Sequence, residues 1–594
     1  MRKVALLLTV LLAAALAMRL SLPRSPPPSP APPPPRSEEW TGSAACAACH
    51  EEIHARWAKT AHANTLRDFS AETTAKPFDG DRFVARDIEQ TLGPGASMEC
   101  EGPGGALARF PVELVIGVRR VQMFTTTLEG GKIQVLPVFL EVQRSKWFDY
   151  ADFIFGGPAQ IEIPPDSPDS WYTFARNFNS RCGHCHTTNY RTGYDADAGS
   201  YETTWTERAV GCESCHGPGG AHVHHWRGML PGEDPILHPA KLPLDRAQQV
   251  CGQCHAEGEV IVPGFRPGED LFAFLDVAGL EDGKHLHPDG RANELIHNLV
   301  PLLQSRCGPL ACTTCHDPHG RGIPGDLYRP LGDDWTCTQC HADKGASIEE
   351  HTHHPRESDG SRCVNCHMPR MVIEGGHGRV FDHTISIPSP RASRQLALPN
   401  ACADCHLLEP IGFEVEPFER WYPGAEERNH RSALARAVLA GRRGAAEAAD
   451  LLTPYLADRN PVYRAGAARL LARGGSDLRA QLRDAHPLVR RAAIDGVAAR
   501  HPEALVPLLE DPNMVIRYRA ARALVDRGDL RERITTVLEG FVALRNDREI
   551  DHYMLGRLYE ASGRLPQAVA SYERYLRLWP WDTATRSRVE RLRK

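Results

Sequence analysis

The chain has 594 residues, of which 42% are hydrophobic and 24% charged, and its net charge is −6. A chain of this length is too long to fold around one hydrophobic core, so we expect two to four domains. The composition is that of an ordinary globular protein. The slightly acidic balance, without a long basic run, argues against nucleic acid as the main partner. The unusual numbers are 18 cysteines and 28 histidines, and no cysteine follows residue 406.

Residues 1–17 are typical of a secretory signal peptide. Two basic residues precede an apolar run from Val4 to Ala17, and small residues at its end offer a cleavage site. An uncleaved anchor is the alternative, although Arg19 keeps the run short for a membrane span. Residues 18–40 are a proline-rich linker, which we expect to be an extended tether. The sequence therefore predicts a periplasmic or secreted, cell-surface protein, with membrane contact only if the first segment is retained.

Sixteen cysteines fall in eight copies of C-x-x-C-H. Two cysteines one helical turn apart can form thioether bonds to one haem, and the following histidine can bind its iron as the proximal ligand. Zinc sites or a disulfide framework would explain the cysteine pairs but not the histidine after every pair. We therefore predict eight covalently attached c-type haems. Cys100 and Cys307, outside the motifs, could form a disulfide or remain separate thiols. The motif cysteines are Cys46, Cys49, Cys182, Cys185, Cys212, Cys215, Cys251, Cys254, Cys312, Cys315, Cys337, Cys340, Cys363, Cys366, Cys402 and Cys405, and the proximal histidines are His50, His186, His216, His255, His316, His341, His367 and His406.

A stretch between the first two motifs, at about 82–150, predicts a small antiparallel β insert. Residues 110–117, 120–128 and 132–142 are rich in valine, isoleucine, phenylalanine and threonine, and Glu129-Gly130-Gly131 suits a hairpin turn. The insert either covers haem edges, which we favour, or forms a docking surface.

The sixth position of each iron decides between electron transfer and catalysis, because a second protein ligand closes the iron to other molecules. Sixteen histidines besides the proximal ones lie between residues 46 and 406, which is enough for two histidines on every iron. His184, inside the second motif, could bind a neighbouring haem. The candidates that lie near motifs are His62, His222, His319, His353 or His354, and His383.

Four segments resemble cytochrome c-554-type multihaem proteins. They are the opening Cys46 to His62, the stretch from Gly211 to Gly219, Cys312 to His319, and Cys363 to Pro369. The resemblance covers roughly residues 40–410 and implies stacked haems, mostly with two histidine ligands, in an electron-transfer protein. All eight motifs keep histidine, so the lysine that marks the catalytic haem of related multihaem nitrite reductases is absent. An activity like that of hydroxylamine oxidoreductase would need one open haem.

After Pro410 the chain becomes rich in alanine, leucine and arginine with helical periodicity. Similar segments begin at Asp458, Asp484 and Asp511, 26 and 27 residues apart, and their aspartate and proline suit the start of a helix. These are HEAT-like repeats over residues 430–545, and residues 546–594 resemble a tetratricopeptide-like helical hairpin. Such a solenoid either docks a redox partner protein or shields the haem region.

The sequence thus predicts a mainly α protein with three parts: an irregular octahaem cytochrome c domain over residues 41–410, its small antiparallel β insert, and a C-terminal α-solenoid. The predicted function is electron transfer in a respiratory or extracellular redox chain, with no residue assigned to catalysis. The alternative is a multihaem oxidoreductase that acts on a small nitrogen or sulfur compound at one open haem.

Overall fold

The computed structural model describes residues 39–594, apart from 86–87, 94–95, 103–104, 156–162, 165–166, 294–296, 309, 373–378 and 425. The predicted signal segment and almost all of the linker therefore lie outside the described residues. The described chain forms two units: Glu39 with Gly220–Pro235 is the smaller, and Trp40–Gly219 with Ile236–Lys594 the larger. The smaller unit carries helix α8 (Gly220–Trp226). In the part of the chain that is described, no helix has the length and apolar character needed to cross a membrane.

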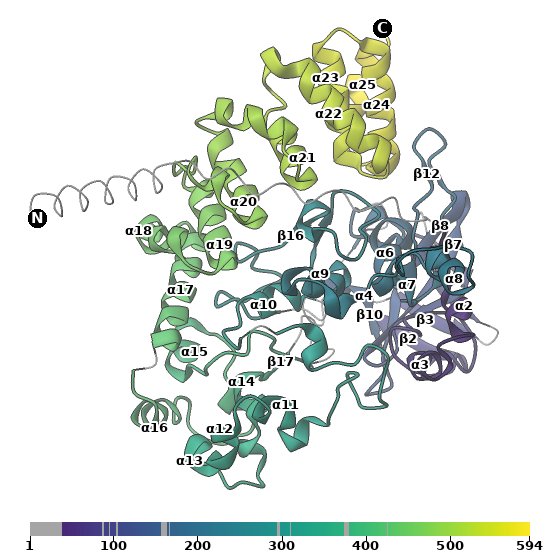
Figure 1. Ribbon diagram of the computed structural model, residues 1–594. Coiled ribbons are helices and arrows are strands. Elements are labelled where there is room, and N and C mark those ends of the chain that lie inside the picture. Colours follow the sequence, from purple (N-terminus) through teal and green to yellow (C-terminus); the bar gives the residue numbers. More distant parts are fainter. Residues whose placement is uncertain are drawn as a thin grey trace, which may run out of the picture. The chain divides into compact units, whose positions relative to one another are not determined.

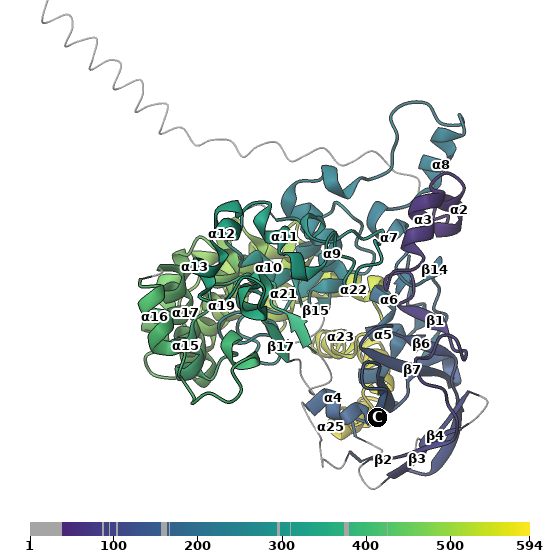
Figure 2. The ribbon, with the colours of Figure 1, turned by 90° about the horizontal axis from the view of Figure 1, so that it is seen from below.

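The β insert consists of two antiparallel sheets and begins earlier than residue 82. A six-stranded sheet has the order β1-β6-β7-β9-β10, with β8 beside β7, and a four-stranded sheet has the order β2-β3-β4-β5 (Figure 2). The predicted hairpin turn is confirmed, because β7 and β8 pair on either side of Glu129-Gly130-Gly131, where both glycines have positive φ. The strands are β1 (Leu66–Asp68), β2 (Asp81–Ala85), β3 (Ile88–Gly93), β4 (Ser97–Glu101), β5 (Leu107–Pro111), β6 (Leu114–Ile116), β7 (Val121–Leu128), β8 (Lys132–Val135), β9 (Val138–Glu141) and β10 (Lys146–Asp149).

Regular structure in the motif-bearing region is short, as expected where cofactors replace an aliphatic core. Its helices are α2 (Ser43–Ala47), α3 (Glu51–Trp57), α4 (Tyr150–Phe155), α5 (Phe178–Arg181), α6 (Gly183–His186), α7 (Glu213–His216), α9 (Leu244–His255), α10 (Leu299–Leu303), α11 (Trp335–Thr338), α12 (Ala342–Ala346), α13 (Ile348–Thr352), α14 (Cys363–His367), α15 (Pro390–Leu396) and α16 (Val415–Trp421). Four two-stranded ribbons join them: β11 (Thr187–Thr188) with β14 (Glu207–Arg208), β12 (Tyr194–Asp195) with β13 (Ser200–Tyr201), β15 (Gly258–Val260) with β16 (Leu275–Val277), and β17 (Arg370–Val372) with β18 (Arg379–Phe381).

The C-terminal region is helical throughout, as predicted (Figure 1). Its helices are α17 (Glu426–Arg443), α18 (Ala448–Leu452), α19 (Pro461–Arg473), α20 (Pro487–Ala498), α21 (Met514–Ala523), α22 (Arg531–Leu544), α23 (Glu549–Ala561), α24 (Leu565–Leu578) and α25 (Thr583–Leu592). The last three cover the segment with the predicted tetratricopeptide-like hairpin, and α23 packs against α24.

The repeated sequence encodes a repeated helix start. Before α19, the Asp458 carboxylate accepts the backbone N–H of Asn460 at 2.7 Å, and Asn460 caps the helix by accepting the N–H of Val462 at 2.9 Å. Arg464 then folds back and donates to the Asp458 carbonyl at 2.8 Å. The same three contacts recur before α20 at Asp484, His486 and Arg490. Before α21 they recur at Asp511, Asn513 and Arg517, except that Asn513 accepts the N–H of Ile516, one residue further along the helix.

One hydrophobic core joins the repeats to the motif-bearing region. Ile261 and Leu280 are fully buried in the same cluster as Leu434, Ile494 and Ile516 of the repeats. The segment that supplies Ile261 begins directly after the fourth motif. The repeat helices therefore cover apolar surface of the haem-binding region and are not a detached tail.

Candidate haem sites

Each C-x-x-C-H motif folds as one helical turn. The backbone N–H of the motif histidine donates to the carbonyl of the first cysteine at 2.9 Å in the first motif and at 3.0 Å in the third. The same bond closes the second, fifth, sixth and eighth motifs, while the fourth and seventh lie in α9 and α14. This turn places both cysteines on one side with the histidine following, which is the arrangement that thioether attachment of one haem requires.

Five motif histidines face a second histidine at a spacing that suits an iron between them. With about 2 Å from iron to each nitrogen and about 1 Å from each nitrogen to its ring centre, two axial imidazoles have centroids about 6 Å apart. The observed centroid distances are 6.2 Å for His255 with His62, 6.2 Å for His216 with His319, 6.4 Å for His316 with His383, 6.2 Å for His367 with His351, and 6.1 Å for His406 with His354. The residues present therefore fit a haem iron at these five motifs.

Hydrogen bonds at Nδ1 orient many of these rings. Histidines that bind metals through one nitrogen usually donate the other N–H to a carbonyl or carboxylate, which leaves Nε2 for the metal. Nδ1 lies within hydrogen-bond distance of a backbone carbonyl in His216 (Leu237, 2.9 Å), His316 (Gly325, 2.8 Å), His367 (Ser386, 3.0 Å), His383 (Phe381, 2.9 Å) and His354 (Thr352, 2.7 Å). These partners favour Nε2 as the iron-facing atom on both sides of the fifth site.

Two histidine rings lie near His216 of the third motif, and only one of them can be its axial partner. His238 lies 6.3 Å from His216, almost as close as His319. However, Nδ1 of His216 faces the carbonyl of Leu237, the residue directly before His238. His319 has its own Nδ1 near Asp317 at 3.5 Å, and its ring is nearly parallel to that of His216. The geometry therefore favours His319 opposite His216.

Burial keeps two of the motif imidazoles in the form that binds metal. It lowers the pKa of His186 and of His255 to about 4, so both rings are neutral at neutral pH. A neutral imidazole has the free lone pair that an iron needs.

The remaining predicted histidines fall into different surroundings. His353 stacks on Trp421 with centroids 4.1 Å apart, whereas its neighbour His354 faces His406. His222 belongs to the smaller unit, where its Nδ1 lies 2.8 Å from Asp234. Among the described residues, no imidazole lies opposite His186 or His341. His184 lies in helix α6 beside His186, and its side chain is exposed.

His351 is the site residue that the sequence interpretation missed. It faces His367 from the end of helix α13, with the two rings almost parallel. The sequence contains a pattern that could have indicated this ligand. His351 and His354 are three residues apart, so each could bind the haem of a different motif.

The two cysteines outside the motifs do not form a disulfide in the structure. Cys100 is a buried thiol in β4, where burial raises its pKa.

Contacts between motifs show which motifs are neighbours. Cysteine side chains lie side by side between the first and third motifs (Cys46 and Cys212), the second and fourth (Cys185 and Cys254), the fourth and fifth (Cys251 and Cys312), and the sixth and seventh (Cys337 and Cys363). Gln253 of the fourth motif donates to the carbonyl of Ser214 in the third at 3.0 Å. Cys315 of the fifth motif lies near Cys337 of the sixth, and α14 packs against the turn that carries the eighth.

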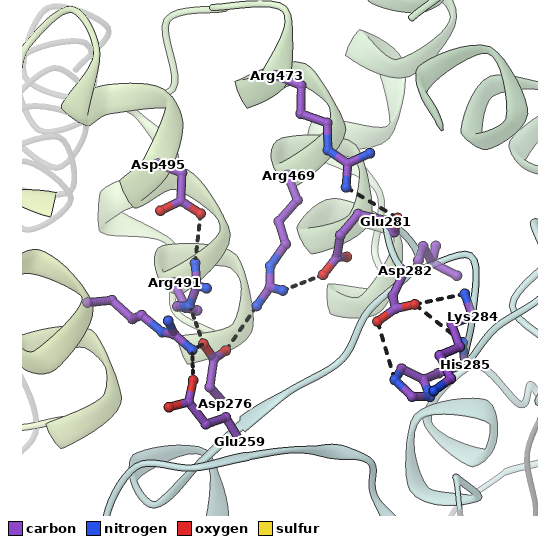
Figure 3. Close-up of polar contacts among 12 residues, drawn as sticks. Glu259, Asp276, Glu281, Asp282, Lys284, His285, Arg469, Arg473, Arg491 and Asp495 are labelled. Atoms are coloured by element: carbon purple, nitrogen blue, oxygen red, sulfur yellow. Dashed lines mark hydrogen bonds and ion pairs between the residues drawn. The ribbon is translucent and has the colours of Figure 1, made fainter. Parts of the chain in front are cut away.

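Arginines of the repeats converge on the ribbon that follows the fourth motif (Figure 3). The buried Asp276 of β16 pairs with Arg469 of α19 at 3.0 Å, Arg491 of α20 at 2.7 Å and Arg519 of α21 at 2.5 Å. Arg519 also reaches Glu259 of β15 at 2.7 Å. Burial by itself would raise the pKa of Asp276, but the three guanidinium groups hold it well below its usual range.

Comparisons with known proteins match separate parts of the chain. The family model for cytochrome c554 and c-prime matches residues 45–90 and 170–217, that for a doubled CXXCH motif matches residues 308–348, and that for HEAT repeats matches residues 475–551. The multiheme cytochrome MtrA of Shewanella baltica (strain OS185) is 24% identical over 255 residues, which are 42% of this chain and 59% of that relative. The match thus spans less than two thirds of the relative's length.

The crystal structure of the outer cell wall cytochrome OcwA is similar with a TM-score of 0.46 and 17% identity, and the match covers 82% of this chain and 99% of that one. The C-x-x-C-H motifs, their common helical turn and the matches to the cytochrome and doubled-CXXCH models make the chain similar to multihaem c-type cytochromes, and its C-terminal region matches HEAT repeats.

Proposed function

We propose that this protein is exported, attaches eight c-type haems and passes electrons along them in a respiratory or extracellular redox chain. The observation that carries the proposal is the set of five facing histidine pairs with centroids 6.1–6.4 Å apart. Two histidine ligands leave an iron no open position, which suits transfer over catalysis. Export is supported by the predicted signal segment at residues 1–17.

The haem iron supplies one-electron oxidation and reduction, and the protein supplies position. The motif cysteines hold each porphyrin edge, and the paired histidines hold the axial positions. Carbonyl partners such as those of Leu237 and Phe381 hold the rings, so that little side-chain movement accompanies a change of charge. His62, His319, His351, His354 and His383 are the proposed distal ligands.

The contacts between motifs support an order for the haems. Numbered by motif, the neighbours connect as 1–3–4–5–6–7–8, and haem 2 branches from haem 4. Electrons would then travel between the first and eighth motifs and reach the second through the fourth.

We also propose that this protein exchanges electrons with a redox partner protein. The repeat surface that carries Arg469, Arg491 and Arg519 holds the ribbon of this same chain, so a partner would dock on another surface of the repeats.

An oxidoreductase is the second candidate, favoured by one observation. Among the described residues, His186 and His341 face no second imidazole, so their irons could bind a small nitrogen or sulfur compound. Of these two motifs, the second is the stronger candidate for an open haem, because its haem lies on the proposed branch.

Spectroscopy of the oxidised protein separates the two functions. Low-spin signals from all haems, unchanged by nitrite, hydroxylamine or carbon monoxide, support the carrier and contradict the enzyme. A high-spin haem that binds one of these ligands supports the enzyme, and the His186→Ala and His341→Ala variants show which motif carries that haem.

A further inference from the structure

A small cavity with both polar and apolar walls lies beside the seventh motif, within the larger unit. Its volume is about 30 Å³, and Cys366 and Ser386 form part of its wall. Ser386 is tied to the proximal histidine of this motif, because its carbonyl accepts from Nδ1 of His367 at 3.0 Å. Helix α17 also lines the cavity, through Arg428 and Arg431.

The lining of this cavity carries more positive than negative charge. Arg291, Arg428 and Arg431 are each less than 9% exposed, and Asp289 is the acidic residue among the described lining. Asp289 forms an ion pair with Arg291, in which Oδ2 of Asp289 lies 2.7 Å from Nε and 2.6 Å from Nη2 of Arg291. Burial would raise the pKa of Asp289, but Arg291 and Arg431 lower it to about 2, so it is ionised and balances one guanidinium.

The direct contacts of Arg428 are with uncharged groups, and its charge also helps to lower the pKa of Glu419, a carboxylate that pairs with Arg391. Its Nη1 donates to the carbonyl of Tyr422 at 2.9 Å, and its guanidinium lies 5.4 Å from the ring centre of Phe418. Within the described part of the chain, no carboxylate lies at ion-pair distance from it. A guanidinium keeps its proton even when buried, and a buried charge without a counter-charge is strongly unfavourable.

We propose that this cavity binds a carboxylate or another small oxyanion, held by Arg428 together with Arg291. The Ser432 hydroxyl of the wall donates to the carbonyl of Arg428 at 2.7 Å and shares a hydrogen bond with Ser389, so the guanidinium groups supply the donors for the anion. A planar carboxylate suits the forked geometry of a guanidinium better than a spherical ion does. The carboxylate belongs either to a propionate of a haem or to a free anion from solution.

The experiment uses the purified holoprotein and formate as the free carboxylate. The variants are Arg428→Gln, which removes the charge, and Arg428→Lys, which keeps the charge but loses the fork. Arg436→Gln is the matched control, because Arg436 lies on the same helix and is exposed. Calorimetric titration measures formate binding. Infrared spectra of protein made with haem that is ¹³C-labelled at the propionate carboxylates report whether a propionate contacts Arg428.

Two outcomes support the proposal and identify the source of the carboxylate. For a free anion, wild type and Arg436→Gln bind one formate per chain, and Arg428→Gln weakens binding by about tenfold or more. For a propionate, formate does not bind, and a labelled carboxylate band shifts in Arg428→Gln but not in Arg436→Gln. If the Arg428→Gln protein does not accumulate, Arg428→Lys takes its place. A lysine ammonium cannot make the two parallel hydrogen bonds of a guanidinium, so formate affinity or the labelled carboxylate band should still change.

The proposal is overturned if wild type binds no formate and the labelled bands of the Arg428 variants match those of Arg436→Gln. The formate result is independent of the haem count and of the axial ligands, so a failed anion site leaves the proposed electron-transfer function standing.

Discussion

The change Asp276→Asn tests whether the repeats are held to the haem-binding region by one buried carboxylate. Asp276 is 4% exposed at its side chain, and it contacts three arginines from three successive repeat helices. Asparagine keeps the size and one oxygen acceptor but removes the charge. Three guanidinium groups then share one fewer counter-charge in a buried position.

The expected cost follows from this loss of charge. Removing one partner of a buried ion pair costs about 3–5 kcal/mol, and the remaining amide oxygen favours the lower end. For a region of this size, 3 kcal/mol corresponds to a fall of about 6–12 °C in the Tm. Asp495→Asn is the matched control, because Asp495 pairs with the same Arg491 at 3.1 Å but is 62% exposed at its side chain.

The assay is thermal unfolding followed by circular dichroism at the helical band. We expect Asp276→Asn to melt clearly below wild type and Asp495→Asn to melt close to it. The arginines lower the folded-state pKa of Asp276, so its stabilisation is present above the unfolded-state pKa of about 3.9 and is lost as pH falls below it. The gap between wild type and variant should therefore narrow below about pH 3.9. Equal melting of Asp276→Asn and wild type at neutral pH would refute the reasoning.

Three further changes test the ligands and the repeats. His354→Ala should convert one haem from low spin to high spin in the electron paramagnetic resonance spectrum, while His353→Ala should not; the reverse result would move the proposed ligand to His353. Asn460→Ala removes the helix cap of α19 and should lower stability by about 1 kcal/mol, seen as a lower denaturation midpoint, whereas an unchanged midpoint would mean that the cap contributes nothing. Removing residues 426–594 should expose the shared core and give insoluble or haem-poor protein; a soluble truncated chain with full haem content would contradict a shared core.

Motifs and local periodicity account for what could be predicted from the sequence. The C-x-x-C-H spacing predicts a helical turn with bonds between residues four apart, and the structure has that turn at every motif. The turn at Glu129–Gly131 and the helix starts at Asp458, Asp484 and Asp511 are likewise local features. In each case, neighbouring residues in the sequence determine the conformation.

Features that depend on distant contacts were harder to predict. His319 and His383 lie close in the sequence to the fifth and seventh motifs, but in the structure they face the third and the fifth. Likewise, Asp276 has no local feature that distinguishes it from a surface aspartate, although three arginines about 200 residues away surround it. Such pairings follow from the tertiary path of the chain, which the motif spacing does not encode.

The number of covalently attached haems tests the central claim most directly. The measurement is the intact mass of the acid-denatured protein, because acid releases non-covalent cofactors and metal ions while thioether-bound haem stays attached. We predict a mass that exceeds that of the processed polypeptide by eight haems. A mass with fewer haems after full maturation, or with none, would contradict the account.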